Sequence, residues 1–165
     1  MPLPPKSWRA SASETVQVVL PNDSNPLGYI LGGTVMHLID ITGAIACHRH
    51  TNRLALTASV DSLDFLHPIK IGDIIILKSR VTCTFRTSLE VEVEVFSESI
   101  TGGRKRTLTS HAYLTFVSLD ENGKPTEVPP LAIETPEDEE RCRAALVRRK
   151  ERLARRQKSP AASSQ

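Results

Sequence analysis

Aromatic residues are scarce in this sequence, and neither a strong charge imbalance nor a long apolar run is present. Phe, Trp and Tyr make up only 4% of the 165 residues, which leaves little for stacking nucleobases. The formal net charge of +2 is too small to indicate a nucleic-acid partner. The first 14 residues contain three prolines and lack the apolar stretch of a signal peptide or a membrane span. We therefore expect a cytoplasmic protein with no nucleic-acid or membrane partner.

Cysteine is also rare, and its pattern points away from structural bridges and metal sites. Cys47, Cys83 and Cys142 show no CxxC spacing, and their odd number argues against a disulfide framework, so we expect free thiols. Cys47 has His48 beside it and His50 close by, but adjacent residues on a helix point in different directions. This disfavours a metal cluster and a Cys-His nucleophile pair, and no metal site is predicted.

The hydrophobic content of 39% is sufficient for one globular domain. Val, Ile and Leu dominate it, which suits a β-rich sheet around a helix. Turn signals and periodicity predict a strand at 15–20, a helix from 34 to about 50, and strands at 54–65, 73–85, 87–98 and 105–119. This order indicates an α+β fold in which an antiparallel sheet wraps around a central helix.

The composition changes after about residue 132, where a charged C-terminal helix is expected. Thr135 is suited to the N-cap, Pro136 to the first helical position, and Glu137 and Asp138 to the first turn. Few apolar residues follow, so weak packing is predicted, and the basic run up to Arg156 is interpreted as a solvated face. The expected division is a flexible tail at 1–12, a domain at 13–132, the helix at 133–157 and a disordered tail at 158–165.

The helix predicted from Thr34 carries an acidic residue, Asp40, at its centre. Apolar residues cover nearly every direction around this helix, so we expect it to be buried on most sides. Desolvating an ionised carboxylate there costs on the order of several kcal/mol unless partners hold it. Asp40 is therefore either catalytic, or it caps or pairs with a neighbouring group. His37, three residues earlier, is the only histidine placed to touch it.

Two features lie just before this helix. Gly32 and Gly33 can present bare amide groups at the positive end of the helix dipole, where an oxyanion would be stabilised. A glycine pair alone is a weak signal, since many turns contain one. Asn25 lies seven residues before Gly32 in a loop with Pro26 and Gly28, and turn formation is the alternative to a role in binding.

The order of these residues is more specific than any one of them. Asn25, Gly28, the pair Gly32-Gly33 and Asp40 are followed by GAIA at 43–46, LTASVD at 56–61, DF at 64–65, PI at 68–69, GD at 72–73 and RTSLEV at 86–91. In this order they resemble the signature of the hotdog-fold acyl-CoA thioesterases, in the branch of the brain-type acyl-CoA hydrolases and their short bacterial relatives. The resemblance runs from about residue 16 to residue 129. Phe85 departs from it, because relatives commonly carry a glycine before the RTS run.

The resemblance implies a hotdog thioesterase domain that hydrolyses acyl-CoA and needs no cofactor, with CoA entering only as part of the substrate. It further implies a homodimer, commonly three dimers, with sites at the shared interface. Asn25 and the amides around Gly32 and Gly33 of one protomer would polarise the thioester carbonyl, and Asp40 of the other would act as general base or nucleophile. Thr57 matches a family threonine that positions water or the aspartate; the alternative is an ordinary strand residue.

The nucleotide end of CoA carries phosphates, which need basic side chains or free amides. Arg86, with Thr87 and Ser88, is the best local candidate for this contact. Two other functions stay open. A hotdog acyl-CoA hydratase would use an Asp-His or His-Glu pair, and a non-catalytic acyl-CoA sensor or assembly module would use the basic C-terminal helix as its partner surface.

Overall fold

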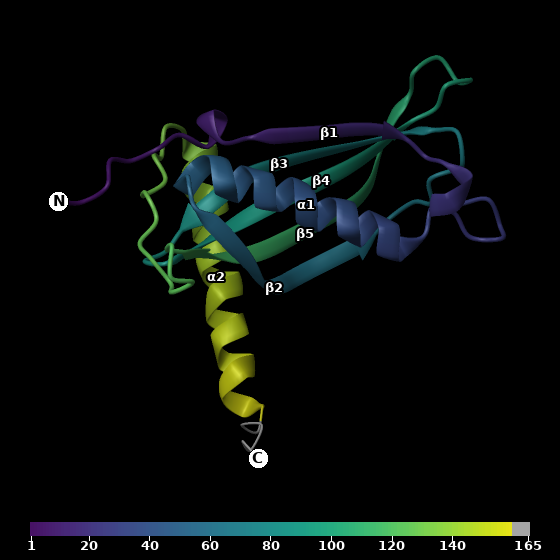
Figure 1. The fold of residues 1–165 in the computed structure, drawn as a ribbon. Helices are drawn as coiled ribbons and strands as arrows, with labels where there is room; N and C mark the ends of the chain where they lie inside the picture. The colour runs from purple at the N-terminus through teal and green to yellow at the C-terminus, as the bar shows by residue number, and fades with distance from the viewer. Residues whose placement is uncertain (160–165) are drawn as a thin grey trace.

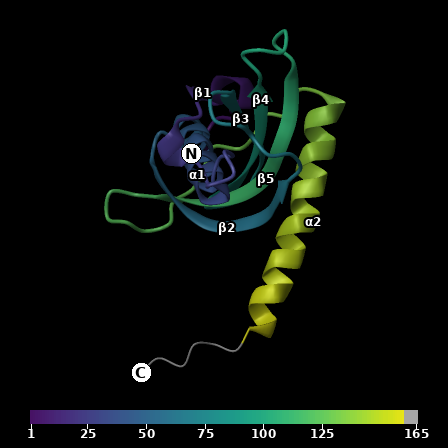
Figure 2. The ribbon, with the colours of Figure 1, turned by 90° about the vertical axis from the view of Figure 1, so that its right-hand side faces the viewer.

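The computed structural model describes residues 1–159. A five-stranded antiparallel sheet of order β1-β3-β4-β5-β2 curves around helix α1, and helix α2 lies on the outside of the curve (Figures 1 and 2). The elements are η1 (Trp8–Ala10), β1 (Ser13–Val18), η2 (Pro21–Asp23), α1 (Gly32–Thr51), β2 (Leu54–Phe65), β3 (Ile74–Thr84), β4 (Ser88–Glu98), β5 (Arg106–Leu119) and α2 (Pro136–Lys158). The predicted antiparallel sheet around a central helix, with a further C-terminal helix, is confirmed.

Alternation along β4 places one set of side chains against α1 and the other beneath α2. Leu89, Val91, Val93 and Val95 are fully buried in the core. The helix lies close to the sheet at Gly43, where an added Cβ would lie 3.2 Å from the ring of Phe116 on β5. A glycine inside a helix normally destabilises it, and here the close contact with the sheet gives the reason for it.

The expectation that α1 is buried on most sides is wrong for the single chain. The curved sheet covers only one face of the helix, so Met36, Ile41 and Ile45 are exposed to 46%, 42% and 36%. The neighbouring strand β2 adds further exposed apolar side chains, namely Leu54, Leu56 and Val60. Exposed apolar side chains on both elements are typical of a surface that another molecule covers.

The apolar packing of α2 is slight, as predicted, but the helix is not weakly held, because polar and covalent contacts join it to the sheet. Arginines on its inner face pair with carboxylates on the outer face of the sheet: Arg141 with Glu92, Arg148 with Glu90, and Arg152 with Asp61. Cys142 forms a disulfide with Cys83 of β3, so the expectation of free thiols fails for this pair. The predicted N-cap is confirmed, since the Thr135 side chain accepts a hydrogen bond from the Asp138 amide within a capping box.

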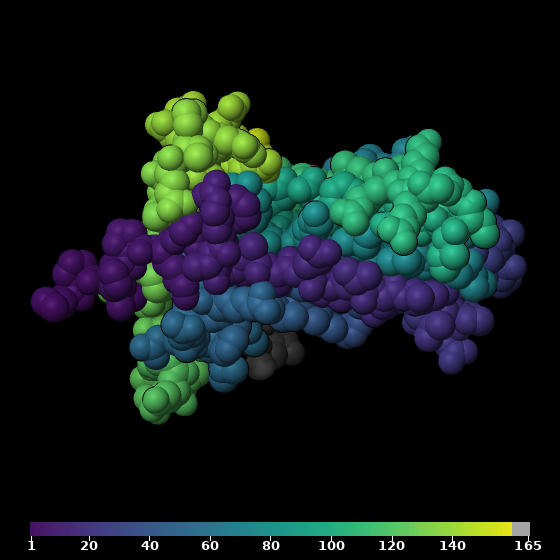
Figure 3. All heavy atoms as spheres, turned by 90° about the horizontal axis from the view of Figure 1, so that it is seen from above, coloured from purple at the N-terminus to yellow at the C-terminus, as the bar shows by residue number. Residues whose placement is uncertain are grey.

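The N-terminal segment was predicted as a flexible tail, but it is attached to the domain from Lys6 onward. The backbone of Lys6 donates to Pro130 O and accepts from Ala132 N. In the view from above, this segment and β1 form the purple edge between α1 and the later strands (Figure 3). These contacts join residues more than 100 positions apart, which local sequence patterns do not reveal. Of the predicted C-terminal tail, Lys158 still belongs to α2, and residues 160–165 lie outside the described residues.

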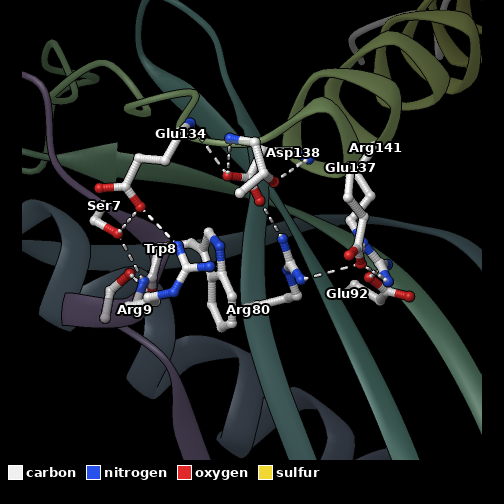
Figure 4. Close-up of polar contacts among 11 residues, drawn as sticks. Ser7, Trp8, Arg9, Arg80, Glu92, Glu134, Glu137, Asp138 and Arg141 are labelled. Carbon is white, nitrogen blue, oxygen red and sulfur yellow. Dashed lines mark hydrogen bonds and ion pairs between the residues drawn. The ribbon is translucent and has the colours of Figure 1, made fainter.

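A cluster of stacked and charged side chains joins the N-terminal segment to α2. The indole of Trp8 lies between the guanidinium groups of Arg9 and Arg80, at 4.7 and 3.8 Å from its ring centroid (Figure 4). Arg80 then donates to Asp138 at 2.9 Å, and Arg9 pairs with Glu134. Cation–π stacking and charged hydrogen bonds thus fix the first turn of α2 against β3.

The pair of His111 on β5 and Glu92 on β4 gives this outer face a pH dependence. The hydrogen bond to Glu92, 2.8 Å long, raises the pKa of His111. Burial favours the neutral form of Glu92, but the bonds and charges of His111 and Arg141 outweigh it and lower the pKa of Glu92. Protonated His111 therefore contributes its full stabilisation below a pH of about 6.5, and this contribution is lost as the pH rises through the raised pKa of His111. Ionised Glu92 contributes its full stabilisation above a pH of about 4.3, and this contribution is lost as the pH falls through the lowered pKa of Glu92.

His111→Gln is therefore expected to lower the melting temperature by about 2–4 °C at pH 6, for a loss of about 1 kcal/mol, and by less at pH 9. The measurement is thermal unfolding at both pH values, with His67→Gln in the exposed loop after β2 as the control. An equal loss at both values would contradict the charged His111–Glu92 pair.

No helix within residues 1–159 combines the length and apolar character needed to cross a bilayer.

Candidate functional site

The structure brings Asp40 and Thr57 together. Thr57 Oγ1 on β2 donates a 2.5 Å hydrogen bond to Asp40 Oδ1 on α1. The pairing of β2 with β5 shifts register between Thr57 and Ser59, directly after this threonine. Such an irregularity re-aims the side chains beside it, which fits the direction of Thr57 toward the helix. The remaining carboxylate oxygen of Asp40 is left for other partners.

Asp40 is half-buried, and its partner is a hydroxyl instead of a basic group. With Thr57 it lines a cleft of about 420 Å³, together with Gly33, Met36, His37, Ile39, Val60, Leu63 and Leu114. The walls of this cleft are mostly apolar, with the carboxylate as its acidic group. A carboxylate that faces an open apolar cleft is placed for chemistry on a bound molecule more than for holding the core together.

Asn25 is held in one orientation by the loop around it. Its Oδ1 accepts hydrogen bonds from the backbone amides of Leu27 at 3.0 Å and Tyr29 at 3.1 Å. Because backbone N–H groups only donate, the oxygen must face them and the NH₂ group must point the other way. Within residues 1–159 that NH₂ group makes no hydrogen bond to the protein. Asn25 thus presents a fixed donor to whatever enters the neighbouring cleft.

The N-terminus of α1 offers further donors beside Asn25. The helix starts at Gly32, and its N-cap residue, Leu31, provides no side-chain cap. The first-turn amides of Gly32 and Gly33 have no intrahelical acceptor, and both glycines are exposed. A Cβ at Gly33 would meet nothing within 4 Å, so the backbone is open to an approaching ligand. These amides can stabilise negative charge on an oxygen atom.

Asn25 and Asp40 line different clefts of the protomer. Asn25 and Gly32 belong to a cleft of about 370 Å³, which Phe65, His67 and other residues complete. The sequence did not indicate that Phe65 and His67 lie here, since they come from the end of β2 and the loop after it, about 40 positions from Asn25. In one protomer Asn25 and Gly32 therefore line one cleft, and Asp40 lines the other together with Gly33 and Thr57.

Arg86, Thr87 and Ser88 lie apart from both clefts, at the turn from β3 to β4. The Arg86 side chain is exposed, and its backbone carbonyl accepts from Val128 N at 3.1 Å. Ser88 O accepts from Phe85 N at 2.8 Å, which closes the turn. The arginine is thus free to contact an anion at the surface.

Cys47 and His50 are buried residues of the core, with no place in either cleft. Burial raises the pKa of Cys47 to about 12, so its thiol is no nucleophile at neutral pH. His50 is fully buried and hydrogen-bonds to Ser11 Oγ at 3.3 Å and to Pro129 O at 3.0 Å. In the described part of the chain, no group of three or more His, Cys, Asp or Glu side chains could hold a metal ion.

Comparison with known proteins connects these residues to a family. The model of the family described as "Thioesterase superfamily" matches residues 27–103. The chain is 41% identical over 143 residues to a Bacillus subtilis protein named "Uncharacterized acyl-CoA thioester hydrolase YkhA", covering 87% of this chain and 83% of that one. It is 34% identical over 154 residues to the rat cytosolic acyl coenzyme A thioester hydrolase, but it spans only 40% of that protein's length.

Solved structures agree with this similarity. The crystal structure of an apo-hexameric acyl-CoA thioesterase matches 95% of this chain and 100% of its own, with a TM-score of 0.89 and 38% identity. A Staphylococcus aureus acyl-CoA hydrolase in complex with butyryl coenzyme A, coenzyme A and coenzyme A disulfide matches 93% of each chain, with a TM-score of 0.85 and 37% identity. Structures of that hydrolase also exist with an aspartate, an asparagine or a threonine replaced by alanine.

Proposed function

This chain belongs to the thioesterase superfamily, and we propose that it hydrolyses acyl-CoA to free CoA and a carboxylic acid at a composite site between two copies of the chain. The main observation in support of a composite site is that its residues are divided between two clefts of one protomer. The carboxylate of Asp40 and the donor group of Asn25 line separate clefts, as expected if each completes the site of the other copy.

The donors act on the thioester carbonyl. The Asn25 NH₂ group, fixed by its two backbone bonds, and the open amides of Gly32 and Gly33 stabilise negative charge as it develops on the carbonyl oxygen. A thioester carbonyl has weak resonance stabilisation, so polarisation and an aligned attacking group suffice. No metal or other cofactor takes part in this mechanism, and CoA enters only as part of the substrate.

Asp40 supplies the attack on the carbonyl carbon. As a general base it takes a proton from water, whose oxygen attacks the carbonyl carbon and displaces CoA as a thiolate. As a nucleophile it displaces the thiolate itself and forms a mixed anhydride that water then opens. In either version the thiolate takes up a proton and leaves as free CoA. Thr57 holds one oxygen of the carboxylate by its short hydrogen bond, which leaves the other oxygen directed to the reacting group. Thr57 is thus a positioning residue in either version.

The Staphylococcus aureus variants support this choice of residues. The asparagine, aspartate and threonine replaced in that hydrolase follow one another at intervals of 15 and 17 residues. Asn25, Asp40 and Thr57 have the same intervals in this chain. Agreement in residue type, order and spacing across a chain of 37% identity is expected if the three positions correspond.

The apolar surface of α1 and β2 supports self-association. Met36 and Val60 line the Asp40 cleft, and Ile41 and Leu56 are further exposed apolar side chains of the two elements that a second copy would cover. The hexameric relatives favour three such dimers in one assembly. We place the protein in the cytoplasm, in agreement with the cytosolic name of the mammalian relatives.

A thiol-release assay over a panel of acyl-CoA chain lengths tests the function. Release of CoA with a preferred chain length is the expected result. Binding of acyl-CoA without release would instead indicate a sensor or assembly module. Loss of absorbance at an enoyl bond without free thiol would indicate a hydratase, for which His37 is the histidine nearest Asp40 in sequence.

A further inference from the structure

We propose that α2 positions the β3–β4 turn (residues 85–88) for CoA binding, and that the Cys83–Cys142 disulfide makes this positioning depend on the thiol–disulfide state. The inference rests on the proposed function, in which Arg86, Thr87 and Ser88 of this turn contact CoA. The inference assigns a role in CoA binding to residues of α2, which lie outside the proposed site.

The helix holds both strands that flank the turn. Cys83 stands two residues before Phe85, and its disulfide to Cys142 brings the two Cα atoms to 4.6 Å. On the other side of the turn, Glu90 is 1% exposed and accepts two hydrogen bonds from Arg148, from Nε and Nη2, each 2.9 Å long. Two successive turns of α2 thus fix the chain before and after residues 85–88.

The turn itself receives further contacts from the C-terminal part of the chain. The guanidinium of Arg149 lies 4.8 Å from the ring centroid of Phe85. The segment that leads to α2 contributes Leu131 N, which donates to Thr84 Oγ1 at 2.8 Å. With its backbone held in this way, the turn presents the exposed Arg86 side chain in a restricted position, which lowers the entropy lost when a phosphate binds.

The covalent link matters because apolar packing contributes little to this interface. The buried residues of α2 are Asp138, Ala145 and Arg152, so a single small side chain supplies the buried apolar surface. Ion pairs such as Arg152–Asp61 offset their own desolvation only in part. A bridge that closes a loop across 59 positions therefore contributes substantially to keeping α2 in place.

A dithiol opens this bridge by thiol–disulfide exchange. One thiolate of the reagent attacks a sulfur of the disulfide, and its second thiolate then closes the reagent to a cyclic disulfide. The protein gains two thiols, at Cys83 and Cys142, and the reagent is oxidised by the same two electrons. Oxidised glutathione reverses the reaction.

The experiment compares the full chain before and after treatment with dithiothreitol. The dissociation constant for CoA, measured by calorimetry, and the KM for acyl-CoA are expected to rise about threefold to tenfold on reduction, with kcat unchanged. Cys142→Ser should show the raised values without reductant, and Cys47→Ala, which removes the buried free cysteine, should respond as the wild type does. Three titratable thiols in the untreated denatured protein, or equal KM values in both states, would overturn the inference.

Arg86→Ala separates this inference from the proposed function. If the turn binds CoA and α2 acts through it, Arg86→Ala weakens CoA binding and removes most of the effect of reduction. Unchanged CoA binding in Arg86→Ala would remove the turn from the CoA site and this inference with it, while hydrolysis in the panel would stand. Weaker binding with an undiminished effect of reduction would show that α2 acts elsewhere, and would overturn only the inference.

Variants of Arg148 test the positioning role of α2 without changing a cysteine. Arg148→Ala should raise KM without changing kcat, and Arg148→Lys should recover part of the loss, since lysine keeps the charge but not the two parallel bonds. A fall in kcat with KM unchanged would contradict a positioning role.

Discussion

Asp40→Asn is expected to lower kcat for acyl-CoA hydrolysis by about 10²- to 10³-fold. The amide keeps the size of the carboxylate and an oxygen for the Thr57 hydrogen bond, so the local structure is retained. It loses the charge and the basicity that a general base or nucleophile needs. CoA binding should change little, because the variant alters the group that attacks and leaves the donors intact.

The measurement is steady-state thiol release, accompanied by thermal unfolding and a mass determination of the assembly. Asp64→Asn is a matched control: the same chemical change on β2, at an exposed carboxylate outside both clefts. Full hydrolytic activity in Asp40→Asn would end the proposed mechanism. An equal loss in the control would assign the effect to surface charge.

The central part of the fold follows from local patterns. The predicted strand at 54–65 coincides with β2, and the alternation of Leu89, Val91 and Val93 with glutamates gives β4 its buried and outer faces. Thr135 with the proline after it predicts the start of α2, and the capping box is present. These signals are short-range, because hydrophobic period and capping chemistry are set by neighbours in sequence.

The outer layer could not be predicted in the same way. The arginines of α2 appear in the sequence as a solvated basic run, and their acidic partners Asp61, Glu90 and Glu92 appear as the polar face of strands. Only the tertiary structure pairs them, across 49 to 91 positions. The Cys83–Cys142 bridge was missed for the same reason, since an odd number of cysteines does not exclude one disulfide beside a free thiol.

The residues of the candidate site could be predicted from the sequence, but their orientation could not. The resemblance supplied Asn25, Asp40 and Thr57, and the structure adds that Thr57 bonds the carboxylate. It also adds that the Asn25 oxygen is occupied by two amides, which determines the direction of its NH₂ group. Orientation of this kind depends on loop geometry, and neither composition nor spacing contains it.

Asn25→Asp should lower kcat by about 10²- to 10³-fold, comparable to the loss of an oxyanion-hole donor. The carboxylate still accepts from Leu27 N and Tyr29 N, so the loop is kept, whereas alanine would release it. What changes is the group facing the cleft: a donor becomes a negatively charged oxygen, which repels a developing oxyanion. Asn22→Asp, three positions earlier and exposed, is the control for added charge. Wild-type kcat in Asn25→Asp would exclude a donor role.

Mixing the two inactive variants tests whether the site is shared between copies. In a dimer with one Asp40→Asn subunit and one Asn25→Asp subunit, a composite arrangement places both changes in one site and leaves the other site intact. Random pairing after co-production should then restore about a quarter of the wild-type activity. If Asp40 and Asn25 act within the same protomer, every site contains one change, and the mixture stays as inactive as its components. Recovery of activity therefore requires that each copy supplies to its partner the half of the site that the partner's own cleft lacks.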